Sequence, residues 1–141
     1  MGRVVYRIFQ GLAWIVFAAV LLQFYFAGVG AFGEETWGDA AFNPHRLTGL
    51  LLLPTSLLML ILAGVAAFTG NLSGRTAGLT ALLFVLLIVQ AALVIAFYES
   101  APIIAALHPV NALILLGLSF HLARSASKSA TPVEPATSRV R

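Results

Sequence analysis

Long, nearly continuous apolar runs are separated by short polar segments along the chain, and this pattern predicts membrane-spanning helices. The apolar residues do not show the two-residue alternation of a barrel strand. Each run is long enough to cross a hydrocarbon layer of about 30 Å as a helix. The runs that we interpret as transmembrane helices cover residues 6–32, 46–69, 76–98 and 103–123. The sequence therefore predicts an all-α integral membrane protein, a four-helix bundle.

The segments between the runs predict how the helices are connected and where the bundle ends. Residues 70–75 (GNLSGR) form a short turn with glycines, so the second and third helices are expected to be antiparallel neighbours. Residues 33–44 form a longer, acidic connection between the first two helices. Residues 125–141 are rich in Ser, Ala, Thr and Pro and have little to bury, which is typical of a flexible tail. We therefore expect a bundle over residues 1–124, followed by this tail.

The composition narrows the classes of protein that remain. Hydrophobic residues make up 60% of the chain and charged residues only 9%, which leaves no room for an ordinary soluble enzyme or a disordered regulator. Cysteine is absent, so disulfides, iron–sulfur clusters and thiol nucleophiles are excluded. The net charge of +3 bears on orientation in a bilayer, and no nucleic-acid partner is expected.

The charged residues predict the orientation of the four helices in the membrane. One side would carry Arg3, Arg7, Arg75, Arg124 and Lys128. The opposite side would carry four carboxylates and a single basic residue, namely Glu34, Glu35, Asp39, Glu99 and Arg46. Because positive residues accumulate on the cytoplasmic side, both termini of this multi-pass protein and its tail are expected to be cytoplasmic.

The second and fourth helices begin with matching sequences, NPHRLTGLLLLP and ALHPVNALILLG. The first and third helices carry a glutamine at similar depth. The matched pairs are His45 with His108, Thr48 with Asn111, Gly49 with Ala112, and Gln23 with Gln90. The chain is therefore interpreted as two repeated helical hairpins, which would place both histidines at the same outer membrane face.

The matched histidines suggest a haem site. Neutral imidazole is a common axial ligand of haem iron, and histidine is rare within membrane spans. The polar residues at i+3 would bond a ligand or the porphyrin edge, and the small residues at i+4 would leave room for a flat macrocycle. Arg46 would pair with a propionate, while Gln23 and Gln90 would cross-link helices or orient the cofactor. Alternatively, a histidine at a helix start is simply an interfacial polar residue, which is our interpretation of His121.

At these residues the chain resembles one four-helix half of the haem A synthase family. The motifs are HRLTG (residues 45–49), HPVNA (residues 108–112) and LLQFYFAGVGAFG, which begins two residues before Gln23, and the likeness spans about residues 6–124. The chain also resembles a family of small four-helix bacterial membrane proteins of unassigned function. The resemblance implies haem b bound by His45 and His108 in a bacterial cytoplasmic membrane.

The chain also departs from the haem A synthase pattern. Ala41, Phe42 and Asn43 stand where that family carries an acidic residue, and Pro109 replaces the arginine of the second motif. The paired cysteines of many members are missing, and only one half is present. Haem A synthase activity is therefore not expected, and the chain is not expected to be an enzyme on its own.

Three functions remain as hypotheses. The leading one is a cytochrome b-like protein with one bis-histidine haem near the outer face, for electron transfer or haem handling. The second is a cofactor-free structural or accessory subunit, which would pack through its Gly/Ala-rich helix faces. A transporter is less favoured, because no carboxylate or lysine lies inside a span. The expected partners are the lipid bilayer and either a larger membrane or redox complex or a second copy of the chain.

Overall fold

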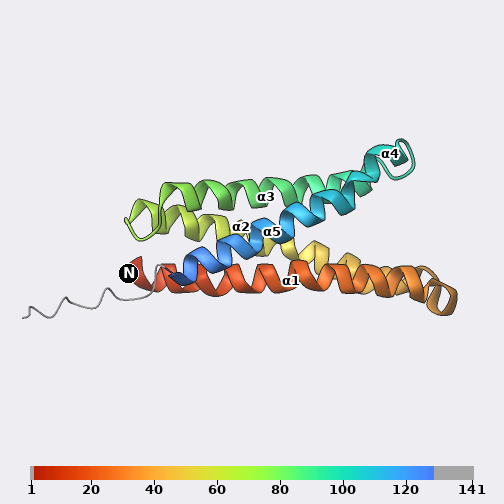
Figure 1. The fold of residues 1–141 in the computed structure, drawn as a ribbon, viewed down its shortest axis with the longest axis horizontal. Coiled ribbons are helices and arrows are strands. Elements are labelled where there is room, and N and C mark those ends of the chain that lie inside the picture. The colour runs from red at the N-terminus through yellow and green to blue at the C-terminus, as the bar shows by residue number, and fades with distance from the viewer. Residues whose placement is uncertain (1, 129–141) are drawn as a thin grey trace, which may run out of the picture.

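The structure, a computed structural model, describes residues 2–128, and these residues form helices and turns with no strand among them (Figure 1). The elements are α1 (Gly2–Trp37), η1 (Gly38–Phe42), α2 (Asn43–Phe68), α3 (Gly74–Ile95), α4 (Pro102–Ala105) and α5 (Leu107–Lys128). The prediction of an all-α chain is thereby confirmed for this part. Helix α5 continues through residues 125–128, which the sequence assigned to the tail. The rest of that expected tail, residues 129–141, lies outside the described residues.

Three continuous helical stretches of the described chain are long and apolar enough to cross a membrane. They are Gly2–Phe68, Gly74–Ile95 and Pro102–Ser127. The first stretch contains α1, η1 and α2, and it turns back at η1 so that α2 runs antiparallel to α1 (Figure 1). The lengths and apolar character of these stretches make a membrane location plausible.

Two glycines with positive φ angles allow the chain to reverse direction. Gly38 (φ +59°) follows α1, and Gly70 (φ +72°) follows α2, in a region of the backbone map that other residues rarely occupy. At the second turn, the hydroxyl of Ser73 accepts a hydrogen bond from the Thr76 backbone N–H (3.2 Å), so α3 begins with a side-chain cap. These local features place α2 and α3 side by side.

The long helices pack as a bundle in which each has two neighbours. Helix α1 contacts α2 and α5, and α3 contacts the same two helices. The predicted packing of the second helix against the third is therefore observed. Helices α2 and α5 lie diagonally opposite, without a direct backbone approach in the described chain. A side chain that joins them must therefore reach across the centre of the bundle.

Helix α3 ends three residues earlier than the 76–98 run predicted. Its last residue is Ile95, and a turn leads to the one-turn helix α4. Pro102 disfavours helical backbone at the residue before it, and Ala101 accordingly lies outside the helical region (φ −150°, ψ 72°). The proline therefore separates α3 from the segment that leads into α5.

The hydrophobic core fills only one half of the bundle. This half leads to the end of the bundle that holds the start of α1, the α2–α3 turn and the end of α5, which we call the basic end (Figure 1). The opposite end holds η1 and α4, and we call it the acidic end. The core comprises Phe9, Ala13, Val16, Val20, Leu52, Met59, Ala63, Leu83, Leu87, Leu115, Leu122, Ala123 and Ala126. On each long helix, the next polar residues towards the acidic end therefore lie just beyond this core.

Candidate functional site

His45 lies in the first turn of α2 and contacts α1. Its Nδ1 atom is 3.1 Å from the backbone oxygen of Gln23, and the ring is half-buried. In return, Gln23 Nε2 donates to the backbone oxygen of His45 (3.2 Å). The histidine and the glutamine are thus joined by two hydrogen bonds between the antiparallel helices.

His108 lies in the first turn of α5 and makes the corresponding contact with α3. Its Nδ1 atom is 3.0 Å from the backbone oxygen of Gln90. The ring is half-buried, as is that of His45. Each histidine therefore contacts the backbone carbonyl of the glutamine that the sequence pattern matched to it.

These two contacts determine the tautomers of the imidazoles. A carbonyl oxygen can only accept, so Nδ1 of each ring must carry the proton. In the neutral ring Nε2 then keeps its lone pair and is available as a ligand. A hydrogen bond from the second ring nitrogen to a carbonyl is also what usually orients a metal-binding histidine.

The two rings approach each other across the centre of the bundle. Their centroids are 6.2 Å apart and their planes meet at 61°. A metal–nitrogen bond of about 2.0 Å, added to about 1.1 Å from Nε2 to the ring centre, puts the centroids of two rings on one metal about 6 Å apart. The observed centroid separation therefore lies in the range of two imidazoles that share one metal ion.

Asn111 links α5 to α3 one helical turn beyond His108. Its side chain is buried, and Nδ2 donates both to the backbone oxygen of Leu86 (2.9 Å) and to Gln90 Oε1 (2.7 Å). The matched residue Thr48 instead donates to the Pro44 oxygen of its own helix (2.7 Å). Both polar groups, which were expected to meet a ligand or a porphyrin edge, are bonded to protein here.

The other residues that the sequence proposed for the site have different surroundings. Gly49 is half-buried and faces α1, where a Cβ atom added to it would lie 3.5 Å from Gln23 Nε2. Ala112 is half-buried on α5. Arg46 is exposed and donates two hydrogen bonds to Asp39 (2.8 and 2.6 Å). A haem propionate would therefore have to compete with the Asp39 carboxylate for the Arg46 guanidinium. The sequence does not predict this ion pair, because Asp39 and Arg46 are brought together only by the η1 turn between them.

His121 is not part of this arrangement. It is exposed near the basic end, with Nε2 3.4 Å from Ser125 Oγ. In the described chain no three His, Asp or Glu side chains converge on one point. The candidate site is accordingly the pair formed by His45 and His108.

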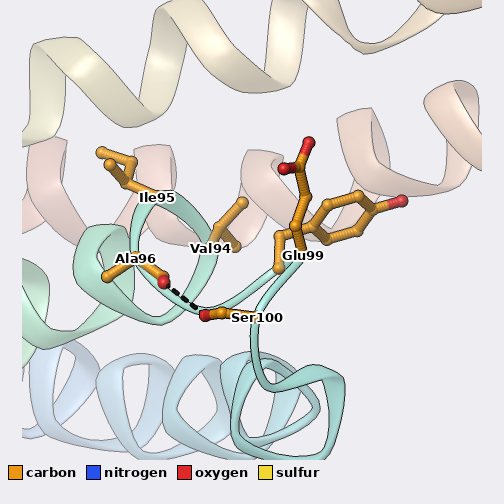
Figure 2. A pocket seen from close by; sticks show the side chains of 6 residues that line it. Val94, Ile95, Ala96, Glu99 and Ser100 are labelled. Atoms are coloured by element: carbon orange, nitrogen blue, oxygen red, sulfur yellow. Dashed lines mark hydrogen bonds between the residues drawn. The ribbon is translucent and has the colours of Figure 1, made fainter.

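A shallow pocket that the sequence did not indicate lies at the acidic end. It is lined by Val94, Ile95, Ala96, Tyr98, Glu99 and Ser100. Figure 2 shows Ser100 Oγ bonded to the Ala96 oxygen (3.0 Å) and the carboxylate of Glu99 pointing away from α5. Val94 is one helical turn beyond Gln90, so the pocket continues along α3 from the level of the histidines.

Comparison with known proteins identifies a family. Residues 23–97 match a family of unknown function (DUF6220), and the match covers more than half of the chain. The chain therefore belongs to this family. The matched region includes Gln23, His45 and Gln90, and it ends before His108. No curated protein and no solved structure matches the chain.

Proposed function

We propose that the chain crosses the bacterial cytoplasmic membrane four times as two repeated hairpins, with both termini in the cytoplasm. The reversal at η1 supports two crossings by the first apolar stretch. The repeated contact between a histidine and a glutamine carbonyl supports the two-hairpin interpretation. The arginines at the basic end support the orientation, because they would face the cytoplasm.

We further propose that the protein binds one b-type haem between His45 and His108, for electron transfer or haem handling. The observation that carries this proposal is the pair of imidazoles at 6.2 Å, each with Nδ1 bonded to a carbonyl. The resemblance to one half of haem A synthase supports the same ligands. A haem needs only two ligands from the protein, because the porphyrin supplies the other four.

The residues around the rings would set the properties of this site. The carbonyls of Gln23 and Gln90 are uncharged acceptors, so the Nδ1 proton stays on each ring and neither imidazole gains imidazolate character. Asn111 binds the Gln90 side chain and thereby holds α3 against α5 below His108. When bound, a haem would supply a one-electron ferric/ferrous couple.

Visible absorption of the purified full chain tests the haem proposal. The protein is expressed with supplemented haem and compared with His45→Ala and His108→Ala; His121→Ala is the matched control, because that ring lies near the other end. We expect a Soret band in the unaltered protein and in the control, and its loss in both ligand variants. A chain that stays colourless after haem supplementation and haemin titration would refute the proposal.

An accessory subunit without a cofactor is the second candidate, and one observation favours it. Every fully buried side-chain nitrogen or oxygen in the described chain already has a hydrogen-bond partner. Asn111 and the Nδ1 atoms of both histidines therefore already serve as helix cross-links without a cofactor. In this case the histidine variants would lose stability without any change in absorption, and the protein would co-purify with a larger complex.

A further inference from the structure

The basic end of the bundle carries exposed arginines and, among residues 2–128, no acidic side chain. Arg3 and Arg7 on α1, Arg75 on α3 and Arg124 on α5 are all exposed there. No carboxylate of the described chain lies at this end, and none of these arginines forms an ion pair within residues 2–128. We call these four residues the arginine rim.

The arginine of the acidic end has a different environment. Arg46 is held by Asp39 through two hydrogen bonds, so its guanidinium already has an anionic partner within the protein. The arginine rim has none in the described chain. An exposed guanidinium favours an anion that matches its planar pair of donors, such as a carboxylate or a phosphate.

A small polar pocket lies within the arginine rim. It is formed by the α2–α3 turn (residues 70–73), by Thr76 and by the end of α5 at Ser125 and Ala126. The hydroxyls of Ser73 and Thr76 are 2.9 Å apart and share one hydrogen bond, which leaves one hydroxyl hydrogen without an acceptor in the described chain. The pocket therefore offers a hydrogen-bond donor in addition to the surrounding charge.

Three residues of the rim adjoin this pocket along the chain. Arg75 stands between the lining residues Ser73 and Thr76, and Arg124 precedes the lining residue Ser125. Arg3 follows Gly2, which is packed against the α2–α3 turn: a Cβ atom on Gly2 would lie 2.2 Å from Asn71 Nδ2. Cationic side chains from three helices thus originate beside one polar pocket.

We propose that the arginine rim and its pocket bind the phosphate of an anionic phospholipid in the adjacent leaflet. The rim lies at the ends of the helical stretches that can cross a membrane, which is the level of the lipid headgroups. Only one of the eight Lys and Arg residues is a lysine, which suits phosphate recognition by the guanidinium fork. Basic pockets between transmembrane helices are a known form of lipid-headgroup site. The proposal is independent of haem binding.

Native mass spectrometry of the full chain released from detergent micelles tests this proposal. The probes are dioleoyl phosphatidylglycerol, dioleoyl phosphatidylcholine with the same acyl chains, and inorganic phosphate. The variants are Arg75→Gln, Arg124→Gln and their combination. Arg46→Gln is the matched control, because it removes an arginine from the opposite end. Circular dichroism verifies that each variant keeps its helix content.

We expect the unaltered protein to retain phosphatidylglycerol in preference to phosphatidylcholine. Each rim arginine removed should weaken phosphatidylglycerol binding about fivefold, as one surface arginine contributes to anionic-lipid binding. Arg75→Lys should weaken it less than Arg75→Gln, and Arg46→Gln should leave it unchanged. Equal retention of the two lipids, or an equal loss in Arg46→Gln, would overturn the proposal. Displacement of the lipid by inorganic phosphate at comparable concentration would show a free-phosphate site instead.

Discussion

Replacement of Asn111 by alanine measures how strongly the polar layer holds α5 against α3. The substitution removes an amide that donates to the Leu86 oxygen and to Gln90 Oε1. Hydrogen bonds between transmembrane helices contribute about 0.6 kcal/mol on average and up to about 1.7 kcal/mol. Because two bonds are lost and the buried side chain leaves a small cavity, Asn111→Ala should lower the free energy of unfolding by about 2 kcal/mol.

Equilibrium unfolding in mixed detergent and SDS micelles, followed by far-UV circular dichroism, gives this free energy. Thr48→Ala is the matched control, since Thr48 occupies the corresponding position on α2 but bonds only to Pro44 of its own helix. Its expected effect is within about 0.5 kcal/mol. Gln90→Ala and the double variant complete a thermodynamic cycle, which should show a coupling of about 1 kcal/mol. Equal losses in Asn111→Ala and Thr48→Ala, together with zero coupling, would refute the assigned role of Asn111.

Two further predictions concern the helix connections and the topology. Gly30→Ala should destabilise the protein by about 1–3 kcal/mol, because the new Cβ would lie 2.3 Å from the Phe42 ring. Gly28→Ala is the control, and it should be neutral or stabilising because no atom lies within 4 Å of a Cβ atom at that site. Equal losses of stability in the two variants would contradict the packing of Gly30 against Phe42. A reporter that is active only in the cytoplasm should be active when fused after Arg141, and a reporter that is active only outside the cytoplasm should be active when fused after Glu99. The opposite result would reverse the proposed orientation.

Local sequence signals account for most of the helical architecture. Continuous apolar runs predict helices because the backbone of a chain in lipid must satisfy its own hydrogen bonds. The glycine-containing turn at residues 70–75 predicts the packing of α2 on α3, as observed. Helix ends are less predictable: α3 stops at Ile95 and α5 extends to Lys128. The extension of α5 depends on packing, because Ser127 accepts a hydrogen bond from Trp14 of α1 (3.0 Å).

For the candidate site, the sequence determined which residues occupy matching positions, and the tertiary structure decided what those residues do. The match of His45 with His108 follows from spacing along the chain, but the 6.2 Å between their rings depends on how two hairpins pack. Thr48 and Asn111 match in position and differ in contact, because the longer amide reaches α3 while the hydroxyl bonds its own helix. Helices that are apolar on every side carry little information about which face meets a neighbour, so such contacts emerge only when the helices pack.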